Sequence, residues 1–220
     1  MPRIARIIAP GIPHHVTQRG NRRMETFFRD EDYQAYLDLM AEWCRKCDVA
    51  IWAYCLMPNH VHLIAVPESE EGLRLAIGEA HRRYSAMINR RQQWTGHLWQ
   101  GRFSSFPMDE TYLLSAAKYI EMNPVRARLV SDPYAWRWSS AQAHAAGQDD
   151  LLVTAAPLLE MVGSWKQFLS DADEEDANKI RGHERTGRAL GGDSFLDSLE
   201  GVLQRPVKPR KAGRKRKSDK

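Results

Sequence analysis

Residues 55–66 read CLMPNHVHLIAV and place two histidines, His60 and His62, at the start of an alternating apolar run. On a β-strand successive side chains point to opposite faces, so residues two apart share a face. The pattern therefore predicts a strand with two imidazoles on one face, and imidazole is the commonest nitrogen ligand for a divalent cation. Two ligands on a rigid strand leave coordination positions open for a substrate oxygen or water. The alternative is a polar pair on a half-exposed strand.

The composition is that of a globular protein. The chain has 220 residues, of which 43% are hydrophobic, and seven tryptophans. This is enough for one domain of ordinary size plus an extension. No run approaches the ~20 apolar residues that a membrane span requires, and the first residues carry only a short apolar patch, so we expect a protein that is neither exported nor membrane-bound. Three cysteines do not form a disulfide framework, which indicates a reducing, cytoplasmic setting.

The charge is unevenly distributed along the chain. Residues 1–148 carry a net charge of +3, residues 149–204 carry −7, and residues 205–220 carry +8 from nine basic and one acidic side chain. A dense Lys/Arg run is typical of an arm that binds a polyanion such as nucleic acid, although many such tails are solvated or act as targeting addresses. We expect this tail to be disordered without DNA. Its candidate DNA contacts are Arg214, Lys215 and Arg216.

Hydrophobic periodicity predicts seven elements before residue 125. Strands are expected over 12–19, 49–56, 61–66 and 104–108, a helix from Asp30, a second helix over 70–91 and a third from Asp109 to Asn123. The order βαββαβα is the ferredoxin-like arrangement, an α+β fold in which an antiparallel sheet carries helices on one face. The inner strand of its hairpin, with the histidine pair, can then lie beneath the third helix.

Four side chains of different chemistry are predicted to converge there. Tyr119 and Asn123 are four residues apart on the third helix and so share a face, opposite His60 and His62. A metal ion held by the two imidazoles and the Asn123 carbonyl could act as a Lewis acid on a phosphate, and a neighbouring tyrosine is a nucleophile that would form a phosphotyrosine. That intermediate conserves the bond energy, so a strand could be cut and rejoined without a nucleotide cofactor.

Basic and aromatic side chains near these motifs are candidate DNA contacts. Three arginines surround the Gly20-Asn21 turn, and guanidinium groups can bind phosphate oxygens in a bidentate manner. The alternative interpretation is a solvated loop. Glycines bracket aromatic residues and an arginine in 96–103, a composition used to stack bases. With the basic side of the second helix, the candidates in the folded part are Arg19, Arg22, Arg23, Arg82, Arg83, Trp99, Arg102, Lys118 and Arg126. His14 and His15 point to opposite faces of the first strand, and each is expected to be structural.

Three motifs, MPNHVH (57–62), WQGRF (99–103) and YIEMNPVRA (119–127), resemble those of the HUH single-tyrosine transposases. The resemblance is closest to the REP-associated tyrosine transposases, which have an IS200-like domain, and it covers about residues 8–145. It implies that His60, His62 and Asn123 bind Mg²⁺ or Mn²⁺ and that Tyr119 forms a 5′-phosphotyrosine on single-stranded DNA. Relatives act on short palindromic hairpins in bacterial genomes, as monomers or homodimers, which implies a bacterial, nucleoid-associated protein.

The sequence thus predicts a metal-dependent transposase that nicks and rejoins single-stranded or hairpin DNA. Residues 1–148 would form the catalytic domain, 149–204 a helical accessory region and 205–220 the tail. In the accessory region one helix is expected over 165–180 and another from Ser194, as a DNA-reading module or a docking helix pair. The alternatives for the whole chain are a catalytically silent hairpin-binding or regulatory protein and a metal phosphodiesterase in which Tyr119 only packs.

Overall fold

The computed structural model describes residues 6–170, 180–184 and 186–208. Its first part follows the predicted order: β1 (His14–Arg19), η1 (Asn21–Arg23), α1 (Asp30–Lys46), β2 (Val49–Met57), β3 (His60–Pro67), α2 (Gly72–Gln92), β4 (Ser104–Pro107) and α3 (Glu110–Glu121). Shorter elements follow: α4 (Asn123–Arg126), η2 (Pro133–Ala135), α5 (Ala141–Ala146), α6 (Ala156–Leu159), α7 (Trp165–Ser170) and α9 (Asp193–Leu203). None of the helices in these described ranges is long and apolar enough to cross a bilayer.

The four strands form one antiparallel sheet in the order β2-β3-β1-β4. This confirms the predicted α+β class and the ferredoxin-like order. β1 and β3 are the two central strands, and their register places Thr17 opposite His62 and His15 opposite Ile64. Because a central strand is hydrogen-bonded on both sides, its register fixes which side chains reach each face. The histidines of β1 and β3 are therefore held rigidly.

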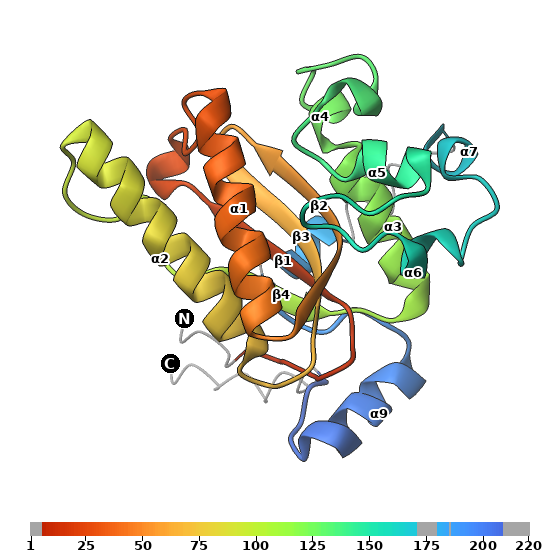
Figure 1. The fold of residues 1–220 in the computed structure, drawn as a ribbon. Helices are drawn as coiled ribbons and strands as arrows, with labels where there is room; N and C mark the ends of the chain where they lie inside the picture. Colours follow the sequence, from red (N-terminus) through yellow and green to blue (C-terminus); the bar gives the residue numbers. More distant parts are fainter. Residues whose placement is uncertain (1–5, 171–179, 185, 209–220) are drawn as a thin grey trace, which may run out of the picture.

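Helices cover both faces of the sheet, which differs from the expected single layer. α1 and α2 lie side by side on one face, and α3 lies on the opposite one (Figure 1). The reason is that alternate residues of β2 and β3 are apolar on both faces: Leu56 and Leu63 pack with α1 and α2, whereas Cys55 and Ile64 pack with α3. A sheet that is apolar on both sides must be covered on both sides.

The accessory region packs against the sheet and α3. Val153 forms a parallel bridge with Ile51 of β2, and Leu190 forms one with Met108 beyond β4. The predicted helix over 165–180 is present as α7 up to Ser170, and residues 171–179 lie outside the described residues. α9 begins after Gly192, close to the predicted start at Ser194, and its N-cap has no side-chain hydrogen bond. The described part of the accessory region therefore packs as part of the same folded unit as the sheet.

The beginning of the predicted tail belongs to the folded chain. Arg205 donates a hydrogen bond to the Arg6 carbonyl, and Val207 is buried with Ile7 in a small core beside α9. Arg214, Lys215 and Arg216 fall outside the described residues. A boundary near residue 208 therefore suits truncation better than one at 205.

A buried carboxylate ties α3 to the accessory region. Glu121, at the end of α3, is fully buried. It accepts hydrogen bonds from Ser140 Oγ at 2.5 Å, His144 Nδ1 at 2.6 Å and Trp165 Nε1 at 2.8 Å. Buried carboxylates need such a complete set of donors, because each unpaired oxygen would carry a desolvation cost. The network fixes the C-terminal end of the helix that carries Tyr119.

Stability should fall in mild acid because of His14. This buried imidazole accepts a hydrogen bond from Ala9 N–H at Nε2 and donates from Nδ1 to the Ile12 carbonyl, and burial lowers its pKa to about 4. The unfolded chain therefore binds this proton first, and stability is lost as the pH falls from about 6.5 towards 4. We expect His14 to contribute about 2 kcal/mol of destabilisation at pH 5 relative to pH 7. Urea unfolding at the two pH values measures it.

The matched variant for this measurement is His14→Gln. It should be less stable than the parent at pH 7 but should lose less stability on going to pH 5. An unchanged difference between the two pH values would exclude His14 as a source of the acid sensitivity.

Candidate active site

The histidine pair lies on the face of the sheet that α3 covers. The ring centroids of His60 and His62 are 4.9 Å apart with the planes nearly perpendicular, and His62 is buried whereas His60 is half-buried. The ring of Tyr119 meets His62 edge-on, with the centroids 5.6 Å apart. Three of the four residues predicted to converge are therefore neighbours.

Asn59, in the hairpin turn, orients His60. Its Oδ1 lies 2.7 Å from His60 Nδ1, and its Nδ2 donates to the Arg23 carbonyl at 2.9 Å. The amide oxygen can only accept, so His60 carries its proton on Nδ1 and keeps a lone pair on Nε2. Gly20 allows this close packing: its N–H bonds the Asn59 carbonyl at 2.8 Å, and a Cβ there would lie 2.2 Å from the Met24 carbonyl oxygen.

Burial keeps both imidazoles neutral. It lowers the pKa of His62 well below its usual value and that of His60 to about 4, with the charge of Arg19 adding to the effect at His60. Neutral imidazoles retain the lone pair that a metal ligand needs. His62 Nε2 is buried and has no hydrogen-bond partner among the described residues. A buried imidazole nitrogen with no partner in the protein can act as a metal ligand, so the pair fits a divalent cation.

Asn123 opens α4, one turn after Tyr119. Its side-chain Nδ2 is buried with no hydrogen-bond partner in the described part of the chain. Amide oxygen and nitrogen are assigned from hydrogen bonds, so rotation of the amide by 180° would place its oxygen at the position of the unpartnered Nδ2. The role of Asn123 as the third ligand stays a prediction.

The phenol of Tyr119 is held protonated at neutral pH. Burial raises its pKa, the Glu184 carboxylate raises it further, and Arg126 and Arg181 lower it. The Arg126 guanidinium carbon lies 4.3 Å from the centre of the Tyr119 ring, and its Nη2 donates to the Tyr119 carbonyl. Arg126, a predicted DNA contact, thus lies next to Tyr119, the predicted nucleophile.

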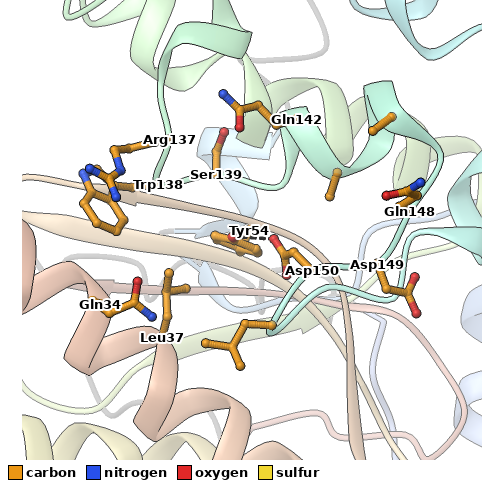
Figure 2. Close-up of a pocket in the computed structure, with 13 residues that line it drawn as sticks. Gln34, Leu37, Tyr54, Arg137, Trp138, Ser139, Gln142, Gln148, Asp149 and Asp150 are labelled. Atoms are coloured by element: carbon orange, nitrogen blue, oxygen red, sulfur yellow. Dashed lines mark hydrogen bonds between the residues drawn. The ribbon is translucent and has the colours of Figure 1, made fainter.

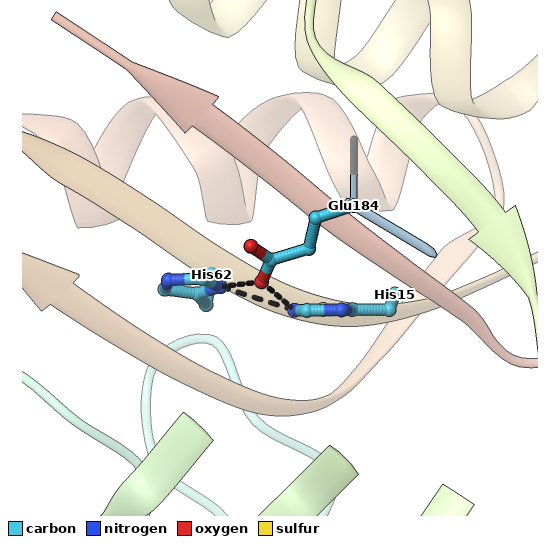
Figure 3. A group of neighbouring side chains, drawn as sticks. All are labelled: His15, His62 and Glu184. Carbon is cyan, nitrogen blue, oxygen red and sulfur yellow. Dashed lines mark hydrogen bonds and ion pairs between the residues drawn. The ribbon is translucent and has the colours of Figure 1, made fainter. Parts of the chain in front are cut away.

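Two residues that sequence reasoning did not assign to the site, His15 and Glu184, lie next to His62. His15 Nε2 is 3.0 Å from His62 Nδ1, and the two rings stack with centroids 5.2 Å apart. Glu184 Oε1 is 3.5 Å from His62 Nδ1 and 3.8 Å from His15 Nε2 (Figure 3). His15, which was expected to be structural, therefore lies beside the histidine pair. The alternation of β1 could have indicated His15, but Glu184 stands in no recognisable motif.

The other candidate DNA contacts fall into separate groups. Arg22, Arg23 and Arg102 are exposed, and the first two have left-handed backbone with φ of 54° and 61°. Arg19 is half-buried near His60. Lys118 on α3 lies over the ring of Phe168, with 4.4 Å from its Nζ to the ring centre. Of these five basic side chains, three lie at or just after the end of β1, Arg102 lies just before β4, and Lys118 lies on α3.

Trp99 is buried, against the stacking role predicted for it, and the α2 arginines lie away from the site around Tyr119. Trp99 is 7% exposed and packs among the rings of Tyr36, His81 and Tyr84, because it caps the core on the α1 and α2 face. It has no free ring face for a base. Arg82 and Arg83 pair with a glutamate of their own helix, Glu79, and α2 lies across the sheet from α3. The structure therefore does not bring either arginine to the site.

A pocket of about 360 Å³ lies elsewhere (Figure 2). It opens between α1 and the segment before α5, beside Tyr54, whose hydroxyl donates to Asp150 Oδ2 at 2.6 Å. Arg137 at its rim lies over the Trp138 ring and pairs with Asp30. Tyr54 packs on the face of the sheet opposite the histidine pair. The pocket is separate from the site around Tyr119.

The family model for "Transposase IS200 like" matches residues 11–123, just over half of the chain. The chain belongs to the IS200-like transposases. Its fold is also that of a solved REP-associated tyrosine transposase, a structure bound to a REP hairpin. This chain is similar to it at 21% identity and a TM-score of 0.58, with 70% of this chain and 92% of the other covered.

A second solved structure, described as a transposase from Deinococcus radiodurans, is more distant. The identity is 19% and the TM-score 0.39, with 55% of this chain and 96% of the other covered. No curated protein matches the sequence. The IS200-like match spans β1 to the start of α4, so it includes the whole histidine motif and residues 119–123 of the tyrosine motif, from Tyr119 to Asn123.

Proposed function

We propose that this IS200-like transposase nicks and rejoins single-stranded or hairpin DNA through a covalent bond to Tyr119. The observation that carries the proposal is the edge-on contact of Tyr119 with His62, 5.6 Å between ring centroids, on the face where His60 also lies. A tyrosine that served only packing would not need two neutral imidazoles beside it. His60, His62 and Asn123 would hold Mg²⁺ or Mn²⁺, which supplies Lewis-acid chemistry at a phosphate when bound.

The chain's own groups account for the covalent step. The Tyr119 oxygen attacks phosphorus, the bond from phosphorus to the 3′ oxygen breaks, and the products are a 5′-phosphotyrosine and a free 3′-hydroxyl. Attack requires the phenol to lose its proton. Arg126 and Arg181 assist because both lower the pKa of Tyr119 and can stabilise the negative charge of the phosphate. Reversal by a 3′-hydroxyl rejoins the strand.

The exposed basic residues near β1 and β4 would hold the DNA backbone. Left-handed backbone at two adjacent arginines, Arg22 and Arg23, is uncommon and costs free energy, and such conformations cluster at functional sites. Asn59 links this loop directly to His60. A phosphate bound by the loop would therefore be positioned relative to the histidine pair. This surface would bind DNA whether the protein is a monomer or a homodimer.

Incubation with end-labelled palindromic single-stranded DNA and Mn²⁺ tests the proposal. A strand that stays attached to denatured protein supports it. Binding without an adduct would instead support a hairpin-binding or regulatory protein, and a free nicked product a metal phosphodiesterase.

Deleting the basic tail should weaken DNA binding without changing which hairpin is preferred. Residues 209–220 hold seven lysines and arginines, and a removed phosphate contact lowers the slope of log K against log salt by roughly 0.7–0.9. The cut at 209 spares the packed Val207. We expect at least about tenfold weaker binding near 0.1 M salt and a flatter salt dependence.

The control for this deletion replaces 209–220 by a neutral Gly/Ser segment of equal length. It should behave like the truncated protein. An altered hairpin preference with an unchanged salt slope would show instead that the tail reads bases.

A further inference from the structure

Three buried ligand atoms converge on one point beside His62. His15 Nε2, His62 Nδ1 and Glu184 Oε1 all lie within 4.8 Å of one another, at separations of 3.0, 3.5 and 3.8 Å. An ion with bonds of about 2.0–2.2 Å and tetrahedral geometry holds its ligand atoms about 3.3 Å apart. The three separations bracket this value, and Figure 3 shows the Glu184 carboxylate reaching toward both histidine rings.

Hydrogen bonding within the protein does not explain the cluster. Glu184 Oε1 is buried and has no hydrogen-bond partner among the described residues. The bond between His15 and His62 uses only one proton, and it leaves the carboxylate oxygen without a donor. An unpaired buried oxygen carries a free-energy cost, which a bound cation or a water molecule would offset.

Burial also prepares the two histidines to act as ligands. It lowers the pKa of His15 to about 3 and that of His62 well below its usual value, so both rings are neutral at physiological pH. Each neutral ring has one lone pair and one proton. Coordination through His15 Nε2 and His62 Nδ1 places the protons on the other two ring nitrogens, and neither of those has another partner in the described ranges.

We propose that His15, His62 and Glu184 form a second divalent-cation site, of the zinc type, which shares only His62 with the ligand set of His60, His62 and Asn123. Two imidazoles and one glutamate, with the fourth position open to water, are a ligand set that suits Zn²⁺. His62 would coordinate this ion through Nδ1, and it would coordinate the ion of the His60, His62 and Asn123 site through Nε2. Because a neutral ring has one lone pair, it binds one ion at a time.

Glu184 gives the site a structural consequence. It reaches the histidines from the accessory region, where the Glu184 carbonyl accepts a hydrogen bond from Ser104 Oγ at 3.0 Å and Leu190 N–H bonds the Pro107 carbonyl. An ion held by all three residues would join this segment to β1 and β3. Arg19, Arg126 and Arg181 place positive charge near Glu184, and this charge would repel a cation bound there. An accompanying anion such as phosphate should offset the repulsion and so strengthen metal binding.

Metal binding without DNA tests this site independently of strand cleavage. Titration of the full chain with Co²⁺ should give the intense visible absorption of a four-coordinate ion, and Zn²⁺ should displace it. Glu184→Gln, which keeps the shape of the side chain, should weaken Co²⁺ and Zn²⁺ binding by roughly tenfold or more. Glu160→Gln, an exposed site in the same region, is the control for lost charge.

Asn123→Ala separates the two ligand sets. It should retain the four-coordinate Co²⁺ spectrum, since it alters only the proposed transposase site. Wild-type affinity in Glu184→Gln, or loss of the spectrum in Asn123→Ala, would overturn the proposal. Neither result depends on whether Tyr119 forms an adduct with DNA.

Discussion

Tyr119→Phe should bind hairpin DNA but form no covalent adduct with it. The substitution removes only the attacking oxygen and leaves the ring that packs against His62 and under Arg126. Loss of the nucleophile eliminates the covalent pathway, so we expect the adduct to fall below detection rather than to decrease by a factor. Denaturing gels of the labelled DNA measure adduct formation, and a gel shift under native conditions measures binding.

Tyr112→Phe is the matched control, because Tyr112 lies on the same helix seven residues earlier. It is half-buried and packs with the α3 side of the core. At about 1.5 Å rise per residue it stands roughly 16 Å along the axis from Asn123, too far to share an ion with it. The adduct should therefore persist in this variant. Peptide mapping of the trapped complex that found the nucleotide on Tyr112 would overturn the assignment and the role given to Asn123.

The histidine pair and Tyr119 could be predicted because local periodicity determines them. Residues two apart on a strand lie on the same face of the sheet. The βαββαβα order then brings the hairpin and the third helix together. The side of the sheet that α3 covers could also have been predicted: β2 and β3 are apolar on both faces, as in Cys55-Leu56 and Leu63-Ile64, so each face needs a covering helix.

Trp99 and Glu184 mark the limits of local patterns. An aromatic residue between glycines is typical of a platform on which bases stack, but an aromatic ring that fills a gap in the core can have the same sequence surroundings. For Trp99, the packing against Tyr36 and Tyr84 distinguishes the core role from the stacking role. Glu184 reaches His62 from more than 100 residues away in the chain. No sequence periodicity connects two such positions, so the contact is visible only in the folded structure.

His62→Ala should abolish strand cleavage while hairpin binding stays nearly unchanged. His62 is buried beneath Tyr119, where it can contact a metal ion but not the extended DNA backbone. The backbone contacts would come from the exposed arginines Arg22 and Arg102 and from the tail, which position DNA without performing chemistry. Removing a group that stabilises charge in the transition state typically costs about 100-fold to 1,000-fold in rate, and we expect at least that loss of adduct.

Two further variants make this result specific. His62→Gln fills most of the space of the ring, so it separates loss of a ligand from a cavity in the core, and it should be as inactive as His62→Ala. His97→Ala changes an exposed histidine in the loop after α2 and should cleave normally. If hairpin affinity collapsed together with cleavage in both His62 variants but not in His97→Ala, the metal-binding residues would also hold the DNA, and binding and chemistry would not be separable in this fold.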